Sequence, residues 1–163
     1  MVILGVDPGL QVAGYCLAVQ AQGKSRLIEA GVLTLKPKDS LPRRVRLFHD
    51  FIEQKIKDNH VTAISLETPF LGRNSQSFLK LGYLRGILYL LADKYQLAIY
   101  EFAPTQVKQA VTGYGSASKD QVQMMIKRLF QAQIDFASYD ASDAVAIALC
   151  GLWQSQCHVS LKK

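Results

Sequence analysis

The sequence lacks any long uninterrupted hydrophobic run, although 49% of its 163 residues are apolar. A membrane-spanning helix needs roughly 20 consecutive apolar residues. The most apolar stretches here are interrupted by Lys80, Arg85 or Asp143. The first apolar run meets Asp7 too early for a secretory signal peptide, so we expect none. These absences exclude a membrane protein and favour a cytoplasmic one.

Cysteine is also scarce, with only Cys16, Cys150 and Cys157. They form no C-x-x-C pair, and their odd number argues against a disulfide framework. Cys16 and Cys150 lie in apolar stretches and are expected to be reduced core residues. A metal role for Cys157 and His158 has only their adjacency to support it.

Acidic residues are in the minority: 13 Asp and Glu face 19 Lys and Arg, which gives a net charge of +6. This balance suits a polyanionic partner such as nucleic acid, although many basic proteins bind none. The length predicts one domain over residues 1–163, with ends that fray from about residue 155.

Short apolar runs bounded by turns predict three strands, over residues 2–7, 12–20 and 26–35. Ser40 and Pro42 predict a capped helix start. The remaining patterns predict strands over 62–67 and 97–102, and helices over 41–57, 76–95, 104–112, 119–130 and about 140–153.

The lengths of the connections indicate the fold class. The first three strands are joined by short turns, which favours an antiparallel meander. The later strands alternate with helices, which favours parallel pairing through right-handed crossovers. We therefore expect an α/β fold with a mixed five-stranded sheet flanked by helices.

Four acids stand out by position. Asp7 and Glu67 each end a predicted strand, and Asp140 and Asp143 lie on one side of the last helix. Ligand sites in α/β sheets favour the strand ends. Acids gathered there repel one another unless a cation neutralises them, and two magnesium ions support in-line displacement at phosphorus. The four acids thus indicate a metal site.

Each acid also has a simpler explanation. Asp7 fits a turn cap, Asp140 an N-cap, and Asp143 a favourable charge in the first helical turn. Glu67 fits a pair with a surface lysine. Taken singly these explanations are favoured, and the high cost of burying an unpaired acid shifts the balance only modestly.

Four blocks carry a family resemblance: GVDPGLQVAGY, LETPFLGRNSQSFLKLGYLRG, APTQVKQAVTGYGSASKDQV and DASDAVAIALC. In order and spacing they resemble the RuvC-type Holliday junction resolvases of the RNase H-like superfamily. The resemblance covers most of the chain. Cys16 and Pro69 depart from the family pattern, and residues 131–139 match it poorly, which bears on loop geometry and sequence preference rather than on the chemistry.

The resemblance implies an RNase H-like fold and a magnesium-dependent endodeoxyribonuclease. Asp7, Glu67, Asp140 and Asp143 would be its catalytic, metal-binding set, holding two Mg²⁺ per active site with Mn²⁺ as a substitute. The enzyme would resolve four-way DNA junctions by paired symmetric nicks, in recombination and DNA repair.

The resemblance also implies DNA contacts. Phe70 would stack on an unpaired base, beside Arg73 and Asn74 in the same loop. Lys108 and Lys119 would neutralise phosphates. The alternatives are a core position for Phe70 and ordinary solvated positions for the two lysines.

The helix around Gly82 and Gly86 is apolar on more than one side. It is either a central core helix or one that also packs on a second copy, and the resemblance favours a homodimer. A branch-migration helicase complex is a further expected partner.

Three rival functions remain. An RNase H-like enzyme would act on an RNA–DNA hybrid or a flap. A junction-binding protein would not cut. A sugar-kinase or actin-like ATPase also opens on a D-x-G strand turn, but the chain is short for the two such domains that those proteins need.

Overall fold

The computed structural model describes residues 1–21, 23–69, 75–130 and 138–160. The strands are β1 (Val2–Asp7), β2 (Val12–Ala21), β3 (Lys24–Thr34), β4 (Ala63–Glu67) and β5 (Ala98–Phe102). The helices are α1 (Leu41–Asp58), α2 (Ser75–Lys94), α3 (Pro104–Thr112), α4 (Lys119–Leu129) and α5 (Tyr139–Ser160).

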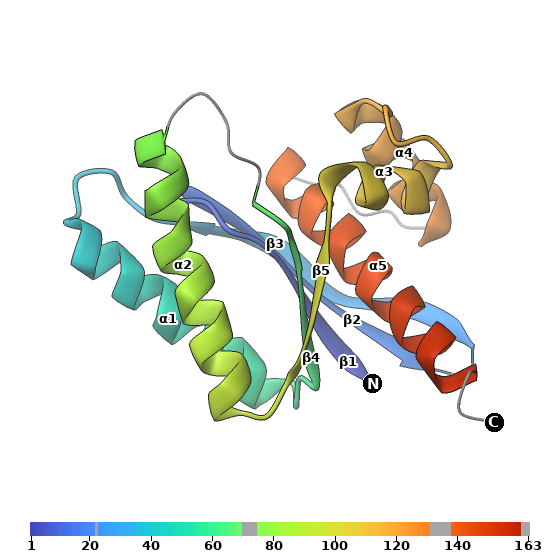
Figure 1. The fold of residues 1–163 in the computed structure, drawn as a ribbon, viewed down its shortest axis with the longest axis horizontal. Coiled ribbons are helices and arrows are strands. Elements are labelled where there is room, and N and C mark those ends of the chain that lie inside the picture. Colours follow the sequence, from blue (N-terminus) through green and yellow to red (C-terminus); the bar gives the residue numbers. More distant parts are fainter. Residues whose placement is uncertain (22, 70–74, 131–137, 161–163) are drawn as a thin grey trace.

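The strands form one mixed sheet in the order β3-β2-β1-β4-β5 (Figure 1). β1, β2 and β3 pair antiparallel, as their short connections predict, while β4 pairs parallel to β1 and β5 parallel to β4. The predicted mixed five-stranded sheet is confirmed. β1 and β4, the two strands that end on acids, are neighbours inside it.

Helices cover both faces of the sheet, α1 and α2 on one and α3, α4 and α5 on the other (Figure 1). Side chains alternate along a strand, so Leu4 and Val6 pack toward α1 and α2, whereas Ile3 packs toward α5. Gly5 also faces α5, because a Cβ there would lie 2.4 Å from a carbonyl oxygen of that helix. The same alternation places Asp7 on the α5 face.

The element boundaries follow the predictions closely, with one exception. Ser40 caps α1 as expected, and its Oγ accepts a hydrogen bond from the amide of Arg43 at 3.4 Å. Cys16 and Cys150 are buried and unpaired, as predicted. However, α5 continues to Ser160 rather than ending near residue 153, because no Gly or Pro follows Gly151 to stop it.

Within the part of the chain that the structure describes, no helix is both long and apolar enough to cross a membrane.

Candidate active site

Asp7 and Glu67 are neighbours at one edge of the sheet. β1 and β4 run parallel with Val6 opposite Leu66, so the next residue of each strand is an acid. Two residues before Glu67, the hydroxyl of Ser65 donates to a carbonyl oxygen of α5 at 2.7 Å. Alternation therefore turns Glu67, like Asp7, toward the face that α5 covers.

Glycine brings α5 close to this edge. Gly14 on β2 lies opposite Asp7, and a Cβ on Gly14 would lie 2.0 Å from the carbonyl oxygen of Asp140. Any other residue would push the helix away. Asp143 follows Asp140 at i+3, on the same side of the helix. The sheet edge and the start of α5 thus place the four acids in one region, where the charges of the other three act on Asp7.

A cavity of about 280 Å³ opens between this edge and α3, α4 and α5. One water occupies about 30 Å³, so a phosphate group and several waters fit. Asp140 does not line the cavity, although its charge acts on Asp7. The lining consists of three acids, two lysines and four further residues: Asp7, Glu67, Asp143, Lys108, Lys119, Pro104, Val107, Val122 and Ala146.

Burial and like charges raise the pKa of Asp7 from its ordinary 3.8 to about 7. Burial is the largest cause, and the charge of Lys119 opposes the shift. The remaining causes are the charges of Asp143, Glu67 and Asp140, in that order. Burial, followed by the charge of Asp143, also raises the pKa of Glu67. Asp7 and Glu67 therefore lie where a proton or a cation is favoured.

Lys119 supplies part of the counter-charge. Its Nζ donates to Oδ2 of Asp143 at 2.8 Å, which raises the pKa of the lysine. A capping box holds Lys119 at the start of α4: the Ser118 hydroxyl accepts from the amide of Gln121 at 3.2 Å, and Oε1 of Gln121 accepts from the amide of Ser118 at 2.8 Å. The Lys119 side chain remains 60% exposed, which leaves it able to turn to a phosphate.

The four acids fit a hard divalent cation by ligand type and charge, because such cations prefer oxygen ligands. Among the described residues, however, no three His, Cys, Asp or Glu side chains meet closely enough to hold an ion as they are placed. One oxygen of Asp143 is held by Lys119. The acids would have to close around a bound ion.

Residues 3–151 match the family model of the crossover junction endodeoxyribonuclease RuvC. The chain belongs to the RuvC family. It is 40% identical over 155 residues to the RuvC of Chloroherpeton thalassium, a match that covers 95% of this chain and 83% of that one. The family resemblance seen in the sequence is confirmed.

Two solved structures of a RuvC protein support the same family assignment. Thermus thermophilus RuvC superposes with a TM-score of 0.86 at 26% identity, covering 97% of both chains. T. thermophilus RuvC in complex with a Holliday junction substrate gives a TM-score of 0.89 at 27% identity, covering 97% of this chain and 96% of that one. RuvC proteins are metal-dependent nucleases of recombination and repair, and this chain is an endonuclease of that kind with the RNase H-like fold.

The residues that the RuvC resemblance assigns to DNA divide into two groups. Lys108 and Lys119 line the cavity beside the acids. Phe70, Arg73 and Asn74 lie outside the described residues, so their roles stay predictions.

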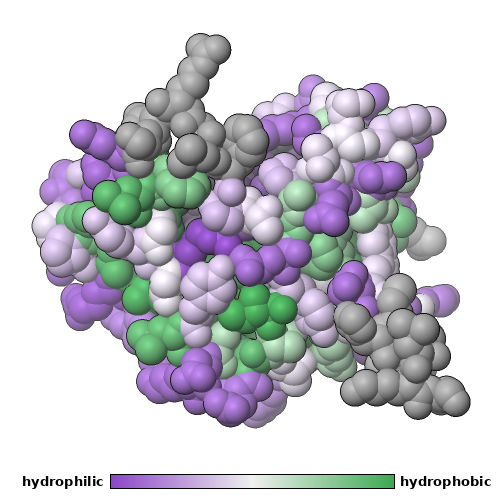
Figure 2. Space-filling view, viewed as in Figure 1, coloured by the Kyte–Doolittle hydropathy of each residue, from purple (hydrophilic) through white to green (hydrophobic). Residues whose placement is uncertain are grey.

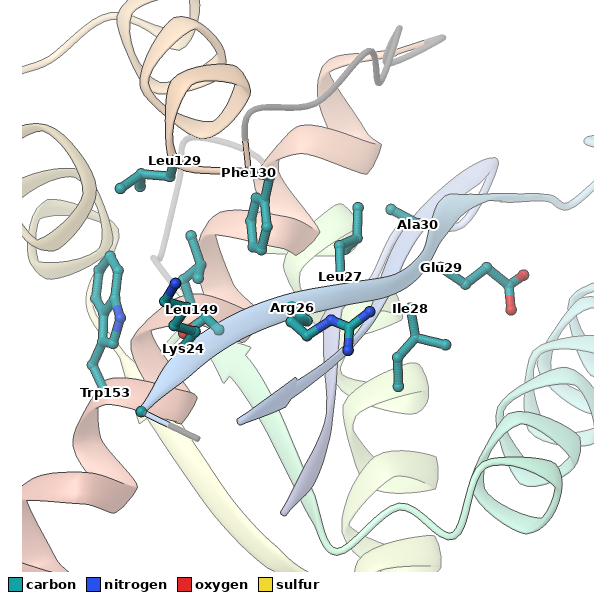
Figure 3. Close-up of a pocket in the computed structure, with 12 residues that line it drawn as sticks. Lys24, Arg26, Leu27, Ile28, Glu29, Ala30, Leu129, Phe130, Leu149 and Trp153 are labelled. Atoms are coloured by element: carbon teal, nitrogen blue, oxygen red, sulfur yellow. The ribbon is translucent and has the colours of Figure 1, made fainter. Parts of the chain in front are cut away.

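A larger cavity of about 1020 Å³ lies beside β3, between Arg26, Phe130 and Trp153 (Figure 3). Leu27 in this region pairs with Ala18, which pairs with Ile3 near the start of β1. The cavity is therefore at the opposite end of the sheet from the four acids of the candidate site, and none of those acids lines it.

The sequence pattern did not reveal the pairing of Arg85 with Glu101. In the sequence Arg85 is only a break in an apolar run, but the structure buries this side chain and pairs it with Glu101. A signal was present, because a charged residue inside a strongly apolar helix is seldom buried without a partner.

Proposed function

We propose that this chain resolves four-way DNA junctions by hydrolysing one phosphodiester bond in each of two opposed strands. Its catalytic acids are Asp7, Glu67, Asp140 and Asp143. The observation that carries the proposal is the burial of Asp7 beside the other three acids, with its pKa raised to about 7. The complex of T. thermophilus RuvC with a Holliday junction substrate supports the choice of DNA.

We propose that two Mg²⁺ ions per active site balance the negative charge of the four acids, and that Mn²⁺ can substitute for Mg²⁺. The four acids would hold the ions through carboxylate oxygens. When bound, the ions supply an activated water and neutralise charge at the phosphate. The chain's own contribution is to mount the acids on strand ends and a helix, so that little motion is needed before reaction.

Lysines bind the DNA backbone at the cavity. Lys108 and Lys119 would neutralise phosphates, with Lys119 exchanging its bond to Asp143 for one to DNA. The exposure of Lys119 and its bond to Asp143 support this exchange. The stacking role of Phe70 and the DNA contacts of Arg73 and Asn74 rest on the family resemblance.

Helix α2 supplies the surface for a homodimer. Leu79, Tyr83 and Leu90 are 62%, 44% and 56% exposed, and a Cβ on Gly82 or Gly86 would meet nothing within 4 Å. Hydrophobic surface gathers along α2 in Figure 2. Such a stripe is typical of an interface, and a two-fold dimer matches the two-fold symmetry of a junction.

Three further parts of the proposal rest on the family or on chain length alone. The chain forms one domain over residues 1–163. It works in the cytoplasm, and a branch-migration helicase complex brings the junction to it.

The test is cleavage of a synthetic four-way junction. With Mg²⁺ we expect paired nicks at symmetric positions, each with a 5′-phosphate and a 3′-hydroxyl that ligase seals. Asp7→Asn, Glu67→Gln, Asp140→Asn and Asp143→Asn should each slow cleavage by roughly 100-fold or more while junction binding persists.

Asp50→Asn is the matched control, because Asp50 is an exposed acid on α1. A catalytic acid variant that cuts at the wild-type rate would remove that residue from the proposal. Tight junction binding without cleavage in Mg²⁺ or Mn²⁺ would indicate a binding protein, and preferential cutting of a flap or an RNA–DNA hybrid would indicate another RNase H-like activity.

A further inference from the structure

Arg85 connects α2 to two strands of the sheet, although only 7% of the residue is exposed. Its Nη1 donates to the carbonyl oxygen of Glu67, the last residue of β4. Its Nη2 donates to Oε1 of Glu101 on β5 and, at 3.0 Å, to the hydroxyl of Tyr89. The Tyr89 hydroxyl donates to the same Oε1 at 2.8 Å.

Stability alone is a poor reason for this arrangement. The Arg85 side chain is buried, whereas that of Glu101 is 35% exposed. An ion pair with one partner removed from water is often no better for stability than apolar side chains of similar volume, and buried apolar side chains, among them Leu84 and Leu88, neighbour Arg85 on α2. Arginine instead offers a rigid planar fork with several donors. The guanidinium of Arg85 contacts the carbonyl oxygen of Glu67 and the side chain of Glu101 on β5 at the same time.

The contacted main-chain atom belongs to an acid of the proposed site. On the other side of the same peptide group, the amide of Thr68 donates to the carbonyl oxygen of Phe102 at 2.8 Å. The peptide that follows Glu67 is therefore held from both ends, by β5 and by Arg85. Its orientation sets the direction in which the Glu67 side chain leaves the strand.

We infer that Arg85, held by Glu101 and Tyr89, positions the carboxylate of Glu67 for cleavage. The inference rests on the proposed function, in which Glu67 is a catalytic acid. Arg85 does not line the cavity, so it is a positioning residue that acts through Glu67.

The test compares Arg85→Met and Arg85→Lys with Leu88→Ala, a matched control that disturbs the buried face of the same helix. Cleavage is followed in single turnover with the enzyme in saturating excess over the junction, below the unfolding temperature of each variant. We expect Arg85→Met to slow cleavage about 100-fold, as a small displacement of a catalytic group does. Arg85→Lys should recover part of the rate, because one ammonium replaces one of the contacts.

Two further measurements separate positioning from general weakening. Junction affinity in Ca²⁺ should be the same for all variants within about threefold, since Arg85 does not line the cavity beside Lys108 and Lys119. Hydrogen exchange at the Thr68 amide, relative to the amides of β2, should accelerate in Arg85→Met and not in Leu88→Ala.

If Arg85→Met fails to fold, Glu101→Gln carries the test, because it removes the charge that holds Arg85 and keeps the side-chain shape. We expect slower cleavage and faster exchange at Thr68 from this variant too. Equal rate losses in Arg85→Met and Leu88→Ala, or unchanged exchange at Thr68, would overturn the inference. If the wild type cuts no junction, the proposed function fails, while the exchange data still decide whether Arg85 holds Glu67.

Discussion

Asp7 is buried beside three other acids, which is an unfavourable place for a negative charge. Its pKa of about 7 means that the folded, metal-free protein holds a proton that the unfolded chain releases near pH 4. Between these values the folded state binds more protons than the unfolded state. The free energy of unfolding therefore falls as pH rises through this range, and the full penalty is present above pH 7.

Asp7→Asn should remove this penalty. In EDTA we expect the variant to be more stable than the wild type at pH 8, by on the order of a few kcal/mol. At pH 4 the two proteins should be nearly equal. Urea unfolding at both pH values measures the difference, and divalent ions should narrow it by stabilising only the wild type.

The control for this pH effect is again Asp50→Asn, since its carboxylate is exposed. Its unfolding free energy should follow that of the wild type at both pH values. Parallel pH dependence in the wild type and Asp7→Asn would mean that the buried charge does not weaken the fold.

At the scale of single residues, the sequence predicts what lies at a strand end better than what a long side chain contacts. The sequence pattern indicates no partners for Arg44 and Lys55 on α1. In the structure, Arg44 donates to the carbonyl oxygen of Leu10 at 3.0 Å. Lys55 donates to Glu29 at 2.5 Å and lies 4.9 Å from the ring centre of Tyr15. These partners are distant in sequence and depend on how the elements pack.

At the scale of elements, the fit between α5 and the sheet places two acids over the other two. The added Cβ of Gly14→Ala would meet the main chain of Asp140, which has no flexible side chain to move aside. The start of α5 must then shift away from β2. We expect a loss of about 1–3 kcal/mol in the free energy of unfolding, as for other overpacked sites, and about 100-fold slower junction cleavage.

Gly31→Ala is the control for this prediction, because its added methyl would meet the Tyr15 side chain at 3.1–3.3 Å rather than main chain. Unfolding curves and cleavage rates of the two variants are compared. Cleavage by Gly14→Ala at the wild-type rate would mean that the position of Asp140 tolerates the shift.

The element pattern was largely predictable because period-two alternation and turn residues are local signals. Alternation alone places Asp7 and Glu67 on one face once their strands are parallel neighbours. The close approach of α5 was not predictable, because the partner of Gly14 is distant in sequence. The end of α5 was also missed, since the chain has no clear stop signal there.

At the scale of the whole molecule, the exposed stripe on α2 predicts the assembly. We expect the wild type to sediment as a dimer and the double variant Leu79→Glu, Leu90→Glu as a monomer. Both positions are exposed, so the free energy of unfolding of the monomer should change by only about 0.5 kcal/mol. The monomer should no longer cut the two opposed strands of one junction together.

Ile28→Glu is the control, because Ile28 is 48% exposed on β3, away from α2. It should leave the dimer intact. A dimer that survives both substitutions on α2 would place the interface elsewhere on the molecule.

The global arrangement was predictable as far as connection lengths determine it. The short connections predicted the antiparallel meander of β1, β2 and β3, and the helical connections predicted the parallel pairing of β4 and β5. The contacts of Arg85 with Glu67 and Glu101 were not predictable, because they join three elements at once. Such contacts depend on the final distances between helix and sheet.

The position of β1 and β4 inside the sheet has a consequence for damaged molecules. Each is hydrogen-bonded on both sides, whereas Lys119 belongs to α4, which lies outside the sheet and packs on α3 and α5 (Figure 1). Elements outside a central sheet open locally before the sheet itself does. A heat-damaged molecule would thus lose the proposed DNA contact of Lys119 while the strands that carry Asp7 and Glu67 are still paired. It would become inactive rather than cut chromosomal DNA without selectivity.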